Sequence, residues 1–293
     1  MYKEDTQEEE RNMDRKVTIV VDSTCDIDVN VAKELGIRYM PILIDINGQS
    51  YKDGYEITAK EFYKKISDKD TQAKTSLVSP LEFEEIFKEE LAKGMDVVCL
   101  TISSSLSGTH NSAMLAKNML ESDKISVIDS KTVSLGFELL TLEAAKLANE
   151  GLSGKEIVEK IESLKEKQRL LVYVETLEML KRGGRIPKSL AAIGGVLRIK
   201  PILAMEDGIL DTVNKTRGKK AGFKFLVEKL NEMEINKDYP FVVAHADNLE
   251  GANELMEEIK DKIKDAKVIV SEIGPAVGTH VGQGAVAMAF IEK

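Results

Sequence analysis

Residues 97–120 read VVCLTISSSLSGTHNSAMLAKNML, a short apolar run followed by a polar loop and then by helical spacing. The run Val97–Ile102 is typical of a buried strand, and an amphipathic helix is expected to continue towards Leu120. A strand, a polar loop and a helix follow one another again at Val17–Val21 and at Ile125–Ile128. Repeated strand–helix units of this length predict a parallel sheet with helices on both faces.

Turn and capping residues divide the rest of the first half. Asn47-Gly48 predicts a tight turn inside a small hairpin excursion over residues 39–51. Ser79-Pro80 predicts a helix start, with a cap followed by proline at the first helical position. The apolar face expected for that helix consists of Leu81, Phe83, Ile86, Phe87 and Leu91.

The second half is less regular and predicts strands that run in mixed directions. Asp207-Gly208 lies between two strand-like runs and predicts a hairpin. The fold class expected is α/β with two domains: a Rossmann-like N-terminal domain with a parallel sheet and a C-terminal domain with a mixed sheet. Residues 1–16 are expected to form a disordered arm because they offer little to bury. The domains are expected at residues 17–168 and 169–293.

Composition and charge argue against several classes of protein. The 293 residues carry a formal net charge of −9, spread along the chain, and an acidic surface repels nucleic acid. No apolar run approaches the roughly 20 residues that span a bilayer, so no membrane segment is expected. Cys25 and Cys99 lie beside apolar runs and are expected to be small core residues of a reducing compartment, which favours the cytoplasm. The histidines and cysteines are not clustered, so no metal site is expected.

Polar clusters follow three of the predicted strands, at residues 22–24, 103–109 and 129–130. In an open α/β sheet, ligands bind at the carboxyl ends of the strands, so these clusters are expected to converge on one cleft. The alternative is that the residues only cap helices, because Ser, Thr and Asp are the usual capping residues.

Ser107-Gly108-Thr109 is the most informative of these loops. Gly108 permits close approach of the backbone, and the helix that follows presents unpaired N–H groups. Such a helix end holds a phosphate or a carboxylate, and the Ser107 hydroxyl adds one donor. The Gly-Lys-Ser/Thr ending of a Walker motif is missing, so anion binding without a nucleotide is expected.

Two further stretches are candidates for the same cleft. Lys74-Thr75-Ser76 can place another hydroxyl there. Three glycines surround His280 in residues 278–284, and glycines so dense indicate a backbone folded tightly against the other domain or a ligand. We therefore expect His280, of the three histidines, to face a ligand.

Basic residues at 181–188, followed by Lys215, Arg217, Lys219 and Lys220, contrast with the acidic chain. Cations at a helix end complement the helix dipole, which is a purely structural role. Docking of an anionic partner surface or a phosphate is the functional interpretation, and both stay open.

Taken in this order, the strings resemble the DegV family of fatty-acid-binding proteins, the lipid-carrying subunits of bacterial fatty acid kinase. The first half contributes DSTCDI at 22–27, TS at 75–76, SSSLSGT at 103–109 and VIDS at 127–130. The second half contributes RGGRI at 182–186, KPI at 200–202 and HVGQG at 280–284. The resemblance runs from about Val17 to the last residue, and its specificity lies in the joint order of the strings.

The resemblance implies that one long-chain fatty acid lies in a tunnel between the two domains, with no other cofactor. The residues implied to surround its carboxylate are Thr75, Ser107, the Gly108 amide and His280. Arg217 matches the family's arginine near the carboxylate entrance, and Arg185 lies in its partner-docking segment. The implied partner is a separate ATP-dependent fatty acid kinase that makes the acyl phosphate, so this chain is expected to have no catalytic residue of its own.

The chain departs from the family's pattern at two places. The family often has Gln-Pro after the Thr-Ser pair, whereas Leu77-Val78 stand here. Where the family has His-x-Gly-Pro-Gly, this chain has Gln283 in place of the proline. The first departure is expected to alter the pocket near the head group, and neither removes a proposed ligand.

Simple energetics agree with an acyl ligand. Burial of about fifteen methylenes at about 0.8 kcal/mol each gives on the order of 12 kcal/mol before association costs. The carboxylate opposes burial unless it is hydrogen-bonded, which hydroxyls and a helix terminus accomplish. Neutral donors, in place of a buried arginine clamp, also ease release.

Two other functions stay open. A serine hydrolase acting on acyl esters would use Ser107 as nucleophile, His280 as base, and Asp22 or Asp129 to orient the base. Against it, the chain lacks the Gly-x-Ser-x-Gly elbow, and Ser107 precedes its helix as a cap does. A regulator that binds phosphate or a sugar phosphate would use the same helix terminus.

Overall fold

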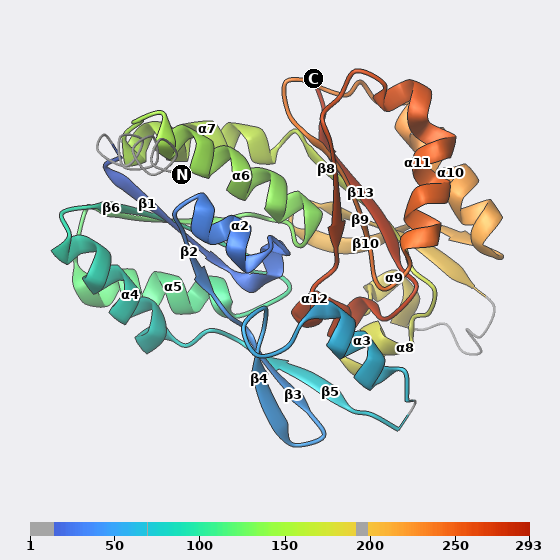
Figure 1. Ribbon diagram of the computed structural model, residues 1–293, viewed down its shortest axis with the longest axis horizontal. Coiled ribbons are helices and arrows are strands. Elements are labelled where there is room, and N and C mark those ends of the chain that lie inside the picture. Colours follow the sequence, from blue (N-terminus) through green and yellow to red (C-terminus); the bar gives the residue numbers. More distant parts are fainter. Residues whose placement is uncertain (1–14, 69, 192–198) are drawn as a thin grey trace, which may run out of the picture.

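The computed structural model describes residues 15–68, 70–191 and 199–293, and its first sheet confirms the parallel arrangement. The sheet has the order β2-β1-β6-β7 with every pair parallel. Its strands are β1 (Val17–Asp22), β2 (Ile37–Met40), β6 (Asp96–Thr101) and β7 (Ile125–Asp129). Helices α4 (Pro80–Ala92) and α5 (Thr109–Leu120) pack on one face, and α6 (Leu135–Asn149) and α7 (Gly154–Lys165) on the other (Figure 1). Helix α2 (Val29–Glu34) joins β1 to β2. Every residue of β1 is buried, as expected for a parallel strand with both faces covered.

Helix α4 begins where the capping pattern predicts. Ser79 Oγ accepts a hydrogen bond from the Glu82 N–H at 3.3 Å, and the Glu82 carboxylate accepts one from the Ser79 N–H at 2.8 Å. Phe83 and Phe87 are fully buried, but Leu81 is 67% exposed, so its assignment to the apolar face was wrong. At about 100° per residue, Leu81 lies about 200° around the helix from Phe83 and so points to the opposite side.

The hairpin excursion is present but starts later than expected. Strands β3 (Leu43–Ile46), β4 (Gln49–Lys52) and β5 (Ala73–Ser76) form a small antiparallel sheet in the order β4-β3-β5, with helix α3 (Ala59–Ile66) between β4 and β5 in the chain. Asn47 and Gly48 both have positive φ, 53° and 87°, as a tight hairpin turn requires. Tyr39 belongs instead to β2, and the chain leaves the first sheet at Pro41, which has no N–H to continue a ladder.

The second half forms a six-stranded mixed sheet in the order β10-β9-β8-β13-β11-β12. Its strands are β8 (Gln168–Tyr173), β9 (Lys200–Glu206), β10 (Ile209–Thr216), β11 (Phe241–His245), β12 (Val268–Glu272) and β13 (Val286–Ile291). Only the β11–β12 pair is parallel. The Asp207-Gly208 hairpin joins β9 to β10 as predicted. Short helices η1 (Ser23–Cys25), α8 (Glu178–Arg182), α9 (Lys188–Ala191) and α12 (Pro275–Val281) complete the chain, and α9 and α12 were not expected.

Side chains of this second sheet alternate between two hydrophobic clusters. In β8, Leu171 and Tyr173 join the cluster under helices α10 (Lys219–Asn231) and α11 (Leu249–Ile263). Leu170 and Val172 point the other way, into the large cluster shared with the first half. Successive strand residues face opposite sides, so the sheet is packed on both faces: by its own helices on one and by the first half on the other.

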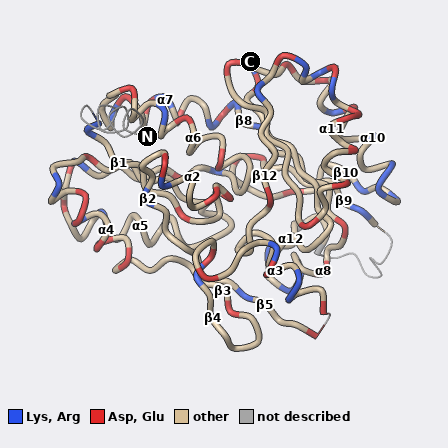
Figure 2. Tube along the Cα trace, viewed as in Figure 1, with Lys and Arg blue, Asp and Glu red and all other residues tan. Residues whose placement is uncertain are grey.

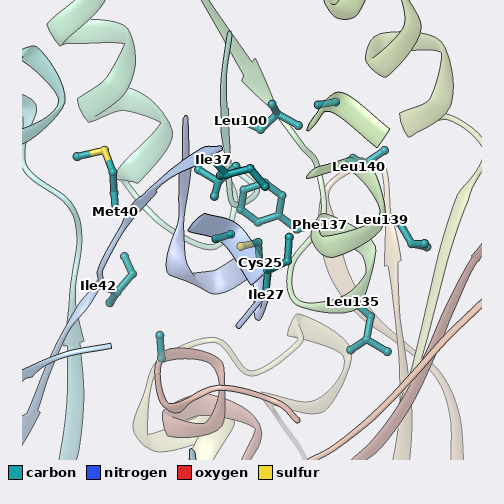
Figure 3. Packing of buried hydrophobic residues seen from close by; sticks show 14 of the residues in the cluster. Cys25, Ile27, Ile37, Met40, Ile42, Leu100, Leu135, Phe137, Leu139 and Leu140 are labelled. Carbon is teal, nitrogen blue, oxygen red and sulfur yellow. The ribbon is translucent and has the colours of Figure 1, made fainter. Parts of the chain in front are cut away.

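Helix α6 fills much of the space between the two sheets. It packs against β1 of the first sheet and against β8, β11 and β13 of the second. Its residues Leu135, Phe137 and Leu140 are fully buried, and Figure 3 shows Phe137 beside Cys25 and Ile27. Most of the helix is covered by its neighbours, and its exposed residues, Lys146 and Asn149, lie near its end. Cys25 and Cys99 are both free and buried, which confirms their interpretation as core residues.

Several expectations concern the limits of the elements. Residues 1–14 of the predicted arm lie outside the described residues, and the boundary at 168/169, where β8 begins, stays a prediction. Within the described ranges, no helix is long and apolar enough to cross a membrane. The same ranges hold no cluster of His, Cys, Asp and Glu that would suit a metal ion.

A buried carboxyl group lies in the joint between the sheets. Glu138 of α6 is 5% exposed and accepts hydrogen bonds from Ser271 Oγ of β12 at 2.9 and 3.0 Å. Burial raises the pKa of Glu138 from 4.5 to about 8, and it raises that of Asp53 to about 7. The folded state therefore holds these protons more tightly than the unfolded chain does.

We predict that Glu138→Gln flattens the pH dependence of stability. Unfolding of the wild type releases a proton from Glu138 between pH 4.5 and pH 8, so the free energy of unfolding falls as pH rises through that range, by up to about 1.4 kcal/mol per pH unit for one group. Denaturant titrations at pH 5, 6.5 and 8 measure this slope. Glu159→Gln, at an exposed site on α7, is the control and should keep the wild-type slope. An unchanged slope in Glu138→Gln would contradict the assignment.

Candidate functional site

A cavity of about 420 Å³ lies where the carboxyl ends of the parallel strands face the second sheet. Thr24 follows β1, Ile102 follows β6, and Val133 and Leu135 lie between β7 and the body of α6. Its volume is within the usual range of about 300–1,000 Å³ for sites that bind small molecules. The carboxyl-terminal edge of the first sheet is thus one wall of the cavity, as its topology predicts.

Aliphatic side chains from both halves line most of the cavity. The second sheet contributes the residues of β8, β9, β10 and β13 that face the first half: Leu170, Val172, Leu203, Leu210 and Ala287. Figure 2 shows that acidic and basic residues gather mainly on helices and loops, while the strands of both sheets are largely free of them. A cavity walled in this way takes an apolar ligand.

Polar groups from three separate segments meet on this cavity. Thr75 Oγ1 of β5 and His280 Nε2 of α12 are 2.9 Å apart, although 205 residues separate them in the chain. Ser107 and Gly108 line the same cavity. Gly108 is the N-cap of α5 and, having no side chain, makes no capping bond; the Thr109 N–H donates to Ser107 Oγ at 3.3 Å. The start of the helix still carries the partial positive charge that attracts an anion. The structure therefore brings Thr75, Ser107, Gly108 and His280 to one place.

Arg185 also lines the cavity, which the sequence did not indicate. Its Nε donates to the Leu106 carbonyl at 3.1 Å and one Nη to the Gly183 carbonyl at 2.6 Å, so the side chain connects the second half to the loop before α5. Arg185 is exposed. Burial of the imidazole, together with the charge of Arg185, lowers the pKa of His280 from 6.5 to about 4, so His280 is neutral at pH 7.

The polar clusters converge only in part. Ser103 Oγ and Ser105 Oγ donate to the Gly208 carbonyl, the former at 2.6 Å, and so hold the β9–β10 turn instead of lining the cavity. Asp22 accepts from the Ile102 N–H at 2.8 Å, and Asp129 from the Lys131 N–H at 2.9 Å. These residues satisfy backbone groups of neighbouring loops, which is the structural alternative that the sequence left open.

The geometry does not support the hydrolase alternative. Ser107 Oγ pairs with Thr109 Oγ1 at 2.9 Å, and His280 Nε2 pairs with Thr75. His280 Nδ1 is buried and has no hydrogen-bond partner among the described residues, so neither Asp22 nor Asp129 orients it. With its pKa near 4, His280 is also a weak base at neutral pH.

Arg217 stays apart from the other predicted site residues. It is exposed, follows β10, and is not among the described residues that line the cavity. The basic residues around α8 are exposed as well, at Lys181 and Arg182. These two residues are therefore accessible at the surface, and Arg185 is the basic residue of this segment that is found lining the cavity.

Helix α12 is the main feature that the sequence interpretation missed. The glycines around His280 predicted a tightly folded backbone and no helix was expected there, but Gly274 and Pro275 start one, a signal that proline at the first helical position gives. Adding a Cβ to Gly278 would place it 2.6 Å from Tyr63 Oη of α3. The close approach to the other half, inferred from glycine density, is therefore confirmed.

Comparisons with known proteins agree with this architecture. A family model described as "Uncharacterised protein, DegV family" matches residues 16–293. A DegV domain-containing protein of Caldanaerobacter subterraneus is 36% identical over 280 residues, 95% of this chain and 99% of that protein. A fatty-acid-binding DegV family protein of Thermus thermophilus has a similar structure, with a TM-score of 0.86 and 28% identity over 95% of this chain and 100% of that one. The fatty acid kinase (Fak) B3 protein of Streptococcus pneumoniae, solved loaded with linoleic acid, gives 0.82 and 25% over the same shares.

We predict that Arg185→Gln raises the pKa of His280. Removing the guanidinium charge removes one of the two causes that lower this pKa, while burial, the larger cause, stays. Titration of the imidazole Cε1–H signal by NMR measures the value. Arg182→Gln, an exposed arginine of the same segment, is the control. Equal His280 titration curves in Arg185→Gln and the wild type would show that this charge does not act on the imidazole.

Proposed function

The chain belongs to the DegV family, and we propose that it binds one long-chain fatty acid in the cavity between its two sheets. The observation that carries the proposal is the cavity itself: aliphatic walls from both halves and a group of uncharged donors on one side. An acyl chain gains free energy from such walls, at about 0.8 kcal/mol for each buried methylene. No other cofactor is part of the proposal.

In this proposal the carboxylate lies against Thr75, Ser107, the Gly108 amide and His280. The partial positive charge at the start of α5 compensates the negative charge without a formal cation. The Thr75 and Ser107 hydroxyls and a neutral His280 add donors whose hydrogen bonds to a charged group are worth about 1.5–3 kcal/mol each. Among the described residues that line the cavity, Arg185 supplies the one positive charge, but its exposure to water weakens its attraction.

The two departures from the family's pattern differ in consequence. Leu77 lines the cavity and is 47% exposed, so it lies at the mouth beside Gly108. Gln283 is exposed, and its Nε2 donates to Asp247 at 2.6 Å. The first departure therefore bears on how the ligand enters, and the second lies on the surface.

We further propose that the chain has no catalytic activity of its own and presents the carboxylate to a separate ATP-dependent kinase, which forms the acyl phosphate. The exposed basic segment around Arg182 and Arg185, next to the cavity, supports a docking role, and Arg217 is proposed to belong to the same contact. The Fak B3 relative is a fatty acid kinase protein by name. Because the proposed partner uses ATP, we propose that the protein acts in the cytoplasm. We also propose residues 17–168 and 169–293 as its two domains.

Purified protein is expected to contain fatty acid and to exchange it for added oleate. Ser107→Ala and His280→Ala should each weaken oleate binding by about tenfold, because each removes one donor to the carboxylate. Solvent extraction with mass spectrometry identifies the ligand, and calorimetry gives Kd. Ser104→Ala, in the same loop but not among the lining residues, should bind oleate as the wild type does. Failure to recover or take up any fatty acid would refute the proposal, and unchanged affinity in both variants would refute the head-group site alone.

Arg217→Ala should lower the rate of acyl phosphate formation by about tenfold and leave the Kd for oleate unchanged. The reason is that Arg217 is exposed and apart from the cavity, so its loss removes a contact with the kinase only. The measurement uses the loaded protein, ATP and a purified fatty acid kinase catalytic subunit. Lys224→Ala, an exposed cation of α10, is the control. A rate equal to that of the wild type would remove Arg217 from the proposed contact.

A further inference from the structure

Gly183 has a backbone conformation that any residue can adopt. It ends helix α8 with φ −77° and ψ −7°, in the right-handed helical region. Its neighbour Gly184 has φ +70°, a conformation that favours glycine. Backbone geometry therefore explains the glycine at 184 but not the one at 183.

The imidazole of His280 occupies the place that a side chain at position 183 would need. A Cβ built on Gly183 would lie 2.1 Å from His280 Nδ1 and 2.8 Å from its Cε1. The same construction at Gly184 meets no atom within 4 Å. The imidazole thus packs directly on the backbone of the segment that follows α8.

Hydrogen bonds hold the backbone on the Gly183 side of this contact. The Gly183 N–H donates to the Met179 carbonyl at 2.9 Å, and the Gly183 carbonyl accepts from Arg185 at 2.6 Å. Arg185 of the same segment also donates through Nε to the Leu106 carbonyl of the first half at 3.1 Å, so the segment cannot retreat without stretching that bond.

The His280 side is held as well. At the start of α12, the Gly274 N–H donates to Asp26 at 3.0 Å, and the Ile273 carbonyl accepts from Tyr63 Oη at 2.9 Å. At its end, the imidazole pairs with Thr75. A methyl group at position 183 would therefore displace the imidazole sooner than either backbone.

We infer that Gly183 is a positioning residue for His280: the bare backbone there sets where the imidazole lies, and so whether it reaches Thr75 and a bound carboxylate. The inference rests on the proposed function for the role of His280, and it adds a residue to that site. It also means that the exposed basic segment and the head-group site share one rigid contact. A partner that moves the segment moves His280 with it.

The test compares Gly183→Ala with Gly184→Ala. We expect Gly183→Ala to weaken oleate binding by about tenfold, the effect of one lost hydrogen bond to the carboxylate, and to shift the His280 Cε1–H signal and raise its pKa towards the ordinary value as the ring moves towards water. Gly184→Ala strains the backbone without touching the imidazole, so its Kd and its His280 signal should match the wild type. Wild-type behaviour of Gly183→Ala in both measurements, or equal effects of the two variants, would overturn the inference.

A double-mutant cycle separates positioning from general damage to the fold. In a His280→Ala background the clash is gone, so adding Gly183→Ala should change Kd less than about twofold. If Gly183→Ala alone fails to fold, the double variant should fold, and its failure to do so would overturn the inference. The NMR comparison needs no ligand. If the wild type binds no oleate, the proposed function fails. The His280 signal of Gly183→Ala still tests whether Gly183 positions the imidazole.

Discussion

The packing of helix α6 between two sheets is the constraint on which the rest of the structure depends. A helix is about 10 Å across with its side chains, so α6 keeps the two sheets about that far apart. The space between the sheets must then be filled along their whole length. The body of α6 fills it with Phe137 and Leu140. Before the first turn of α6 there is no helix to fill this space. Residues 133–135 and the facing side of the second sheet line a cavity there instead. The packed joint and the cavity thus have one cause: α6 begins part-way along the space between the two sheets.

Polar contacts across the joint decide where the head-group side of that cavity lies. Asp26, which follows η1, accepts from the N–H of Gly274, the N-cap of α12, and also from Ser134 Oγ at the start of α6. Tyr63 Oη donates to the carbonyl of Ile273, two residues before α12 begins. These contacts tie a helix of the second half to the first half, so that His280 reaches Thr75. Burial raises the pKa of Asp26 well above its usual value, which is the electrostatic cost of a polar anchor inside the joint.

The electrostatics of the site suit a ligand that is held and then released. His280 is neutral at physiological pH, the N–H groups of α5 carry only partial charge, and the guanidinium of Arg185 is exposed. A buried ion pair would retain a carboxylate more strongly, and its separation would leave an unpaired charge. Most of the affinity then comes from the apolar walls, and the polar groups set the orientation of the ligand. The site differs from a set of neutral donors alone in one respect: it includes the charged Arg185, which is hydrogen-bonded to loops of both halves.

The sequence by itself determined most strands and helices, both hairpin turns and the cap of α4, because periodicity and capping are local properties that a few neighbouring residues specify. It also indicated Ser107, Gly108, Thr75 and His280 through the joint order of their strings. Only the tertiary structure decided which serines of residues 103–107 face the cavity, since Ser103 and Ser105 are used by the Gly208 carbonyl, which lies more than a hundred residues away in the chain. The same holds for Arg185, which reaches the cavity where Arg217 does not, and for Gly183, whose missing side chain is explained by an imidazole from another helix. Contacts between residues so distant in sequence depend on how two sheets pack around α6, and no local pattern records that packing.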